Sequence, residues 1–353
     1  MPLSSLARTQ LSLWISQLLL AVPIRSRATF VELLCACLVS PEGWVTRAIS
    51  AICRRKHWTT SQAHRTRQHP HRAPGPHHLS LVLTVLAPDA ILLVIDDTLV
   101  PRGSLSAPGC DIRFDHAHKI NRPDFLRSQN WVTLGIRIFT AEGRRWVLPL
   151  LSRLVPATGN RNKLTLALAL IRALAPAADI PIRVLFDSWF MRARLVLPLL
   201  HRGFQVVGQA RCDTALFLPP PPRTGRGRPR KYGQKLTRAE IETLPAILLT
   251  LNLYGTDQTV RIRSIVALAR FLRGAPVRAV WCEFFDPNDQ AWSKPRLLLA
   301  SETQVSPETV LRLYARRWGI EICQPYNLCK SEVNKYHVIS NGGRLRPAAT
   351  AIA

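Results

Sequence analysis

Residues 90–98 read AILLVIDDT, a run of apolar residues that ends in Asp96 and Asp97. An unbroken apolar run of this length, rich in branched side chains, is typical of a strand that is buried on both faces. The stretch VLFDSW at residues 184–189 repeats the pattern, because its apolar residues lead directly into Asp187. Acidic residues therefore stand at the carboxyl ends of two predicted buried strands, and these two runs decide the fold.

The segments between and after these two runs alternate between strand and helix patterns. Further strands are expected at residues 131–139, 146–151, 182–186 and 204–208, and helices at residues 164–174 and 191–200. The order strand, strand, strand, helix, strand, helix, strand is that of an RNase H-like domain. We therefore predict an α/β fold built on an RNase H-like mixed sheet with flanking helices, in which the first and fourth strands are neighbours.

The chain changes character from residue 211 onwards. Strand-like runs recur at residues 246–251, 260–266, 277–284 and 296–299, which predicts a β-rich insertion. Ser306, Pro307 and Glu308 then provide an N-cap, a first-turn proline and a first-turn acid. A helix is therefore expected to begin there and to carry residues 311–321 as the last element of the core.

Apolar residues recur three and four positions apart between Leu11 and about Lys56, which predicts a small helical N-terminal domain. Residues 59–78 are polar and rich in arginine, histidine and proline, as expected of a basic linker. The expected organisation is a helical DNA-binding domain at 1–58, a linker at 59–88, a catalytic core at 89–210, a β-rich insertion with a basic loop at 211–300, a catalytic helix at 301–335 and an irregular tail at 336–353.

The charge balance points to a polyanionic partner. The chain has 48 Lys and Arg residues against 22 Asp and Glu residues, a formal net charge of +26 and a pI near 11.1. An excess of this size favours nucleic acid, because many basic side chains can neutralise phosphates and release their counterions. A high-GC genome would explain the preference for arginine over lysine, but it does not explain the shortage of acids.

The apolar and cysteine patterns indicate a compartment. No apolar run reaches the length needed to span a bilayer, so we expect no membrane partner. The eight cysteines form no paired CxxC motif, which argues against a structural zinc site and against a disulfide framework. A reducing, cytoplasmic location is therefore expected.

Three acidic positions stand where a strand or a helix would fix their direction: Asp96 or Asp97, Asp187 and Glu321. Phosphodiester cleavage and strand transfer need an activated hydroxyl and a stabilised leaving oxygen, and two Mg²⁺ ions held by carboxylates supply both. Successive side chains of a strand point to opposite faces, so only one member of the Asp96–Asp97 pair can enter such a site. Asp96 is our first choice, and Asp97 stays open.

Tyr314 and Arg317 precede Glu321 by seven and four residues, so all three would share one face of the last helix. Arg317 could orient Glu321 or grip a DNA phosphate. Each signal also has a simpler explanation, since two acids at a strand end often form a turn and an Arg/Glu pair on a helix is usually a surface ion pair. The combination, in this order and on these elements, is more specific than any one signal.

Residues 223–238 concentrate basic side chains on a backbone rich in glycine and proline. The side chains expected to contact DNA are those of Arg223, Arg226, Arg228, Arg230, Lys231 and Lys235. The sequence Gly227-Arg228-Pro229 is like a hook that enters the minor groove, where a narrow groove attracts arginine. The simpler alternative is a solvated loop.

Three motifs resemble the catalytic blocks of one known family. LLVIDDT, VLFDSWF and YARRWGIE are similar to the three blocks of bacterial insertion-sequence transposases of the DDE type, and especially to the group with a Tyr-x2-Arg-x3-Glu-x6-Lys signature. Tyr314, Arg317 and Glu321 hold its first three places. The resemblance implies an RNase H-like endonuclease in which Asp96, Asp187 and Glu321 bind two Mg²⁺ ions, with Mn²⁺ as a substitute.

The same resemblance implies partners and a location. The DNA partners would be transposon ends and target DNA, a homodimer would form in the synaptic complex, and the protein would be associated with the bacterial nucleoid. The signature lysine would fall at Leu328, whereas the nearest lysine is Lys330, two residues later, and Pro325 interrupts the run after Glu321. This departure indicates a C-terminal part that is truncated or frame-shifted.

Two other functions stay open at this point. A decayed, non-catalytic DNA-binding protein would use the acids as turn and cap residues and the basic surface as its whole function. An RNase H-like nuclease or resolvase would share the carboxylate chemistry but would cut DNA without joining it.

Overall fold

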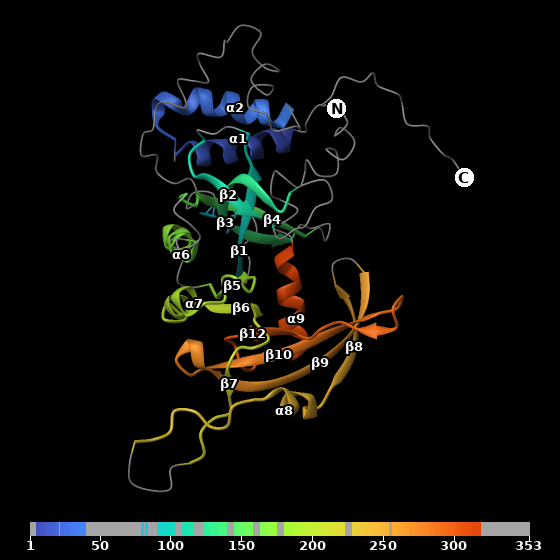
Figure 1. The fold of residues 1–353 in the computed structure, drawn as a ribbon. Helices are drawn as coiled ribbons and strands as arrows, with labels where there is room; N and C mark the ends of the chain where they lie inside the picture. Colours follow the sequence, from blue (N-terminus) through green and yellow to red (C-terminus); the bar gives the residue numbers. More distant parts are fainter. Residues whose placement is uncertain are drawn as a thin grey trace, which may run out of the picture.

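A large mixed sheet forms the centre of the molecule (Figure 1). The computed structural model describes residues 5–20, 22–39, 79–80, 82–83, 90–103, 107–115, 123–139, 145–157, 163–174, 180–222, 228–253 and 256–318. Within these ranges 12 strands form the sheet, and a few helices pack on it. The predicted α/β class with a mixed sheet and flanking helices is therefore confirmed.

The first half of the sheet carries the two acidic runs. Its strands are β1 (Ile91–Pro101), β2 (Cys110–Phe114), β3 (Phe125–Phe139), β4 (Arg145–Leu154), β5 (Ile182–Phe186) and β6 (Gln205–Ala210). Strand β1 pairs antiparallel with β3 and parallel with β5, and β5 pairs parallel with β6. The expected neighbourhood of the two acid-bearing strands is confirmed. The short β2 was not expected, and it pairs with the first residues of β3.

Strand β1 is longer than its apolar run predicts. The expectation that it ends at Ile95 is wrong, because Asp96 and Asp97 pair with Thr133 and Val132 of β3 and the ladder continues to Pro101. The parallel pairing with β5 stops earlier, at Val94. Acids are uncommon in buried strands, and this explains why the sequence pattern placed the end too early.

Two layers of side chains cover the two faces of the sheet. Helices α6 (Lys163–Leu174) and α7 (Ala193–Leu200) pack on one face, and α9 (Pro307–Ala315) packs on the other. In β1, odd-numbered residues such as Leu93 and Ile95 lie in the layer that contains α6 and α7. Leu92 and Val94 lie in the layer that contains α9. The alternation of a strand thus supplies one residue in two to each layer.

The β-rich insertion extends the core sheet. Its elements are β7 (Leu216–Phe217), α8 (Arg238–Thr243), β8 (Ile247–Leu253), β9 (Thr256–Ala269), η3 (Arg270–Leu272), β10 (Ala275–Asp286), β11 (Ala291–Trp292) and β12 (Arg296–Ala300). Strand β12 pairs antiparallel with β6, and β10 and β9 follow it outwards. Helix α9 comes directly after β12, so the insertion returns the chain to the acid-bearing part of the sheet.

The N-terminal part is helical where it is described. Helix α1 (Ser5–Leu19), the 3₁₀ turn η1 (Ile24–Ser26) and helix α2 (Arg27–Val39) come first, and residues 40–78 lie outside the described part. Leu79 and Val82 are buried in the same cluster as α6 and α7. No helix in the described ranges combines the length and hydropathy that a bilayer crossing requires.

Candidate active site

Asp96 and Asp97 lie on opposite faces of β1. Asp96 continues the row of Leu92 and Val94, which faces α9, whereas Asp97 continues the row of Leu93 and Ile95. The backbone N–H of Asp97 donates a hydrogen bond of 2.9 Å to Oδ1 of Asp96. The two carboxylates therefore meet different surroundings although they are adjacent in the chain.

Asp96 forms a buried ion pair with Arg317. The Nη1 atom of Arg317 lies 2.8 Å from Oδ2 of Asp96, and the two side chains are only 8% and 11% exposed. Burial raises the pKa of Asp96 to about 7, the Arg317 guanidinium opposes that rise, and the charges of Asp187 and Asp97 add to it. A carboxylate in these surroundings is costly to ionise unless positive charge is close.

Asp187 directly follows β5, and its side chain shapes the turn that comes next. Its Oδ1 atom accepts hydrogen bonds from the backbone N–H groups of Trp189 (3.0 Å) and Phe190 (3.3 Å). Burial raises the pKa of Asp187, the charge of Asp97 raises it further, and Arg317 and the two backbone hydrogen bonds lower it. The turn thus fixes Asp187 beside the carboxylates of β1.

Asp97 is held by partners on the face that α6 covers. Its Oδ2 atom lies 2.7 Å from Nζ of Lys163 and 2.9 Å from Nδ2 of Asn130. The Lys163 ammonium also lies 4.7 Å from the ring centroid of Trp189. These contacts tie β1, β3 and the start of α6 to the turn after Asp187, and they hold the Asp97 carboxylate close enough for its charge to raise the pKa of Asp187.

Sequence reasoning missed Lys163 and Asn130. The only hint of a role for Lys163 was its position at the start of the apolar helix KLTLALALIRAL. A single lysine at such a position is usually exposed to solvent. Asn130 lies inside β3. The strand predicted from the sequence began at Trp131, the residue after Asn130, so the prediction left Asn130 out. Both residues are buried, and only the three-dimensional fold brings them to Asp97.

Helix α9 brings Tyr314 and Arg317 to the sheet. Ser306 caps the helix by accepting a 3.1 Å hydrogen bond from the N–H of Thr309, with Pro307 in the first turn, as the sequence predicts. The Tyr314 hydroxyl donates to Oε1 of Gln209 at 3.0 Å. The α-helix ends at Ala315, and a 3₁₀ turn, η4 (Arg316–Trp318), then presents Arg317 to Asp96.

The remaining predicted residues of this site lie outside the described part of the chain. The description ends at Trp318, so it includes neither Glu321 nor Leu328 and Lys330. In the ranges that are described, no three His, Cys, Asp or Glu side chains form a group that could hold a metal ion. The structure therefore brings together Asp96, Asp97, Asp187 and Arg317, and the third acid stays a prediction.

The donor set of this cluster suits a hard cation. Asp96 and Asp187 offer carboxylate oxygens, the ligands that Mg²⁺ prefers. Asp96 is buried and Asp187 is half-buried, and in both desolvation is the main cause of the raised pKa. A dication would compensate the two charges more fully than Arg317 alone, so the chemistry of these two carboxylates fits such an ion, and its further ligands would have to come from elsewhere.

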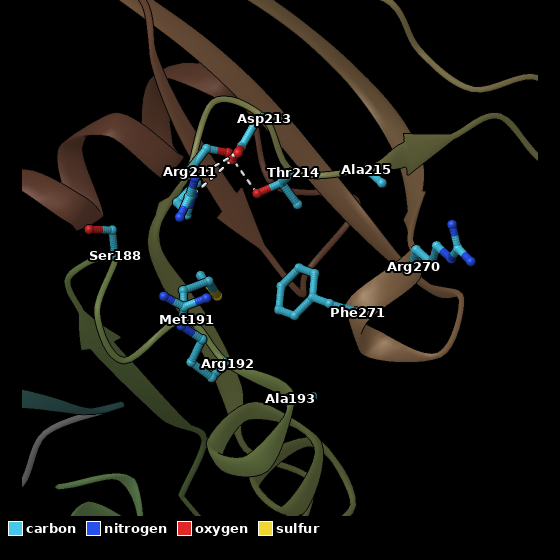
Figure 2. Close-up of a pocket in the computed structure, with 10 residues that line it drawn as sticks. All are labelled: Ser188, Met191, Arg192, Ala193, Arg211, Asp213, Thr214, Ala215, Arg270 and Phe271. Atoms are coloured by element: carbon cyan, nitrogen blue, oxygen red, sulfur yellow. Dashed lines mark hydrogen bonds and ion pairs between the residues drawn. The ribbon is translucent and has the colours of Figure 1, made fainter. Parts of the chain in front are cut away.

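An open pocket begins at the residue after Asp187 (Figure 2). Its volume is about 730 Å³, and it lies between the turn after β5, the start of α7, the segment after β6 and the turn η3. Three arginines and one aspartate supply its charged groups: Arg192, Arg211, Arg270 and Asp213. The pocket therefore carries a positive surplus next to the acidic cluster.

Comparison with known families decides the identity of this arrangement. The family model for the DDE superfamily endonuclease matches residues 76–267, more than half of the chain. The chain belongs to this superfamily. The match includes Asp96, Asp97 and Asp187, and it ends before α9 and Arg317. The expected membership among DDE endonucleases is thus confirmed, and members of this superfamily use divalent metal ions.

Other comparisons add a distant likeness. A solved structure of a piggyBac transposase, in a synaptic complex with hairpin DNA, is 12% identical with a TM-score of 0.34. The alignment covers 90% of this chain and 57% of that chain, so this DDE superfamily member spans just over half the length of that transposase. A comparison with curated protein sequences finds no match.

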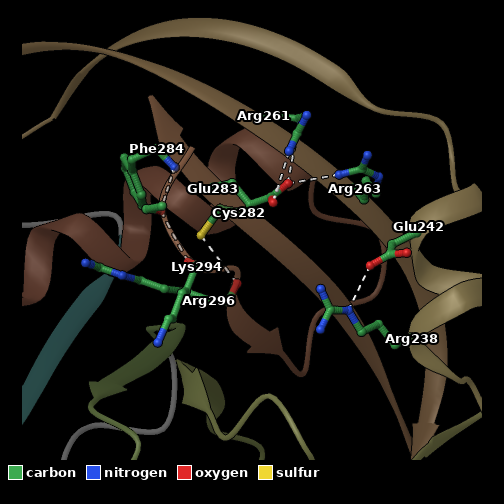
Figure 3. Close-up of polar contacts among 10 residues, drawn as sticks. Arg238, Glu242, Arg261, Arg263, Cys282, Glu283, Phe284, Lys294 and Arg296 are labelled. Atoms are coloured by element: carbon green, nitrogen blue, oxygen red, sulfur yellow. Dashed lines mark hydrogen bonds and ion pairs between the residues drawn. The ribbon is translucent and has the colours of Figure 1, made fainter. Parts of the chain in front are cut away.

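The basic residues of this DDE superfamily member fall into two groups. Among the predicted DNA contacts, Arg223 and Arg226 lie outside the described part, and the exposed ones are Arg228, Arg230, Lys231 and Lys235. By contrast, arginines of β9 are engaged within the protein (Figure 3): Arg261 and Arg263 lie 2.8 Å and 3.0 Å from Oε2 of Glu283. Arg261 also lies 4.6 Å from the ring centroid of Trp292. Exposed and unshared arginines are the better candidates for phosphate contacts.

Proposed function

We propose that this chain is a transposase that cleaves DNA at the ends of a mobile element and transfers the freed strand into target DNA. The observation that carries the proposal is the placement of Asp96 and Asp187, each two residues beyond the last parallel pair of β1 and β5, with Asp96 buried and Asp187 half-buried, in a chain of the DDE superfamily. Carboxylates on neighbouring segments of one sheet are suited to share metal ions on one scissile phosphate.

Asp96, Asp187 and Glu321 would hold two Mg²⁺ ions, and Mn²⁺ would substitute. When bound, such a pair of ions activates an attacking hydroxyl and stabilises the leaving 3′ oxygen of an in-line displacement. Arg317 compensates the charge of Asp96 and fixes the direction of its carboxylate. The turn after Asp187 fixes the second carboxylate through two backbone hydrogen bonds. The chain's own contribution is therefore a prearranged set of oxygen ligands.

The two chemical steps would use the same site. Hydrolysis at the element's end would break a phosphodiester and free a 3′ hydroxyl. This hydroxyl would then attack a phosphate of the target strand and displace that strand's 3′ oxygen, so one phosphodiester forms as another breaks. The exposed residues Arg228, Arg230 and Lys231 would contact end DNA through its phosphates and minor groove. A homodimer would pair two ends in a synaptic complex, as the resemblance to insertion-sequence transposases implies.

Nicking of supercoiled plasmid tests the enzymatic part of the proposal. The parent chain should convert supercoiled plasmid to the open circular form with Mg²⁺, and EDTA should stop the reaction. Asp187→Ala should lower the rate by about three orders of magnitude, because it removes a metal ligand from a site whose members act as a unit. Equal nicking by the parent and by Asp187→Ala would sink the proposal.

Strand transfer separates a transposase from a nuclease or resolvase. A pre-cut oligonucleotide with a free 3′ hydroxyl at the element's terminal sequence should become joined to plasmid DNA by the parent chain. Cleavage without joining would instead support an RNase H-like nuclease or resolvase. Binding without cleavage would support a decayed, non-catalytic DNA-binding protein.

A further inference from the structure

The arginine-lined pocket beside Asp187 has its own partners and its own place in the fold. Its walls come from four segments that meet at the ends of β5 and β6 (Figure 2). Ser188 stands at one side, directly after Asp187, and the Phe271 ring points into the space between the other side chains. The pocket therefore begins one residue after Asp187 in the chain, but none of the acids Asp96, Asp97 and Asp187 lines it.

Two of the three arginines in this pocket are available to a ligand. No hydrogen bond or ion pair within the described ranges engages the guanidinium groups of Arg192 and Arg270, and both side chains are exposed. Arg211 pairs with Asp213 at 2.7 Å and 2.9 Å, but both partners are about two-thirds exposed, so the pair is a weak one. The arginines of β9 differ, because Glu283 already binds them.

The backbone at the start of α7 adds to the positive potential. Arg192 occupies the N-cap position, its side chain makes no capping hydrogen bond, and no acid stands in the first turn. The backbone N–H groups of a helix's first turn project outward from its N-terminal end, and they carry partial positive charge. Ala193, the first residue of α7, lines the pocket. An anion in the pocket would meet this end of the helix as well as the arginines.

The order of the strands places the pocket at the same edge of the sheet as the acids. Strands β1, β5 and β6 run parallel in that order, and Asp96, Asp187 and Arg211 lie where this parallel pairing stops, just beyond its last paired residues. Neighbouring strands lie about 4.8 Å apart, and phosphates along one DNA strand follow one another every 3.4 Å or so of the helix axis, roughly the same scale. A strand whose scissile phosphate lies at the acids would bring a neighbouring phosphate to the pocket.

We propose that Arg192, Arg211 and Arg270 bind a backbone phosphate of the DNA strand next to the scissile bond, with Phe271 and Met191 as the apolar wall for its sugar and base. This inference rests on the proposed function, because it takes the acids as the place of cleavage. The pocket fixes the register of the strand over Asp187. It is a positioning site, and its residues do not take part in the chemical step.

The first experiment measures binding of the full chain to a random-sequence duplex of 30 base pairs, with Ca²⁺ in place of Mg²⁺, over a series of KCl concentrations. The variant is Arg192→Gln with Arg270→Gln. The matched control is Arg202→Gln, an exposed arginine just beyond the other end of α7. The double variant should bind about tenfold more weakly or worse and lose about one unit of salt slope, as expected when one phosphate contact is lost. The control should stay within about twofold of the parent, as expected for a surface charge away from the DNA.

A second experiment places the DNA without any arginine variant. A single strand that carries 5-iododeoxyuridine is bound to the parent chain and irradiated, and the crosslinked peptides are identified by mass spectrometry. A crosslink at Phe271 or Met191 is the expected result. Equal binding by the double variant and the control, or crosslinks that avoid residues 188–193 and 268–273, would overturn the pocket proposal even if the parent chain nicks plasmid DNA. If the parent chain neither binds nor nicks DNA, the proposed function fails first and this inference fails with it.

Discussion

An Asp96→Asn variant is expected to lose Mg²⁺-dependent nicking by about a thousandfold or more, whereas Asp97→Asn is expected to keep a readily measurable rate. Asp96 lies on the face that α9 covers and pairs with Arg317, whose charge also lowers the pKa of Asp187. Asp97 lies on the opposite face, with Lys163 and Asn130. Metal-binding carboxylates of one site act as a unit, so the loss of one removes most of the catalysis.

The cost of Asp97→Asn should appear in stability. Its carboxylate pairs with Lys163 at 2.7 Å, with the two side chains 17% and 8% exposed. Loss of one partner leaves the other charge buried without compensation, which costs about 3 kcal/mol or more of unfolding free energy. Urea unfolding of both variants, beside the plasmid assay, separates the two roles. The reverse result, with Asp97→Asn inactive and Asp96→Asn active and less stable, would assign the catalytic role to Asp97.

Arg317→Gln is expected to shift the pH dependence of nicking upwards by one pH unit or more. Burial raises the pKa of Asp96 from 3.8 to about 7, and the Arg317 guanidinium is the main influence that lowers it. Without that guanidinium the pKa of Asp96 rises further, so a higher pH is needed to ionise the carboxylate that would bind Mg²⁺. The pH–rate profile of plasmid nicking, from pH 6 to about pH 9.5, measures the shift.

The raised pKa of Asp96 also determines how the unfolding free energy changes with pH. Because the folded chain binds the Asp96 proton more tightly than the unfolded chain, this group makes the unfolding free energy fall as pH rises from about 4 to about 7. In Arg317→Gln the fall should continue above pH 7. Arg312→Gln is the matched control, since Arg312 lies on α9 in an exposed pair with Glu308. An unchanged profile in Arg317→Gln would contradict the ion pair as an influence on Asp96.

Much of the sheet could be predicted from the sequence because buried strands and capped helices leave local patterns. The apolar run before Asp187 predicted β5 with its observed limits, and Ser306 and Pro307 predicted the start of α9. The limits of β1 were missed because its outer part is held by pairing with β3, a contact that local pattern does not encode. Strand alternation placed Asp96 and Asp97 on opposite faces, and the structure shows the two surroundings that follow.

The parts of the site that could not be predicted depend on distant contacts. Lys163 reaches Asp97 across 66 positions of the chain, and Arg317 reaches Asp96 across 221. Neither pairing leaves a periodic signal, and Arg317 was expected beside Glu321 or a DNA phosphate. The arginine pocket likewise combines four segments, and no two of its arginines are adjacent in the sequence. Charge composition predicted a polyanionic partner, but only the fold shows which arginines remain unshared.

The central claim is that Asp96, Asp187 and Glu321 share divalent metal ions, and calorimetric titration of Mn²⁺ into the full chain tests it most directly. The parent chain should show saturable binding of up to two ions at pH 8, where the Asp96 carboxylate is ionised. The variant Asp96→Asn/Asp187→Asn/Glu321→Gln should show none, while its melting curve stays cooperative. Identical Mn²⁺ binding by the parent and by this folded variant would contradict the account.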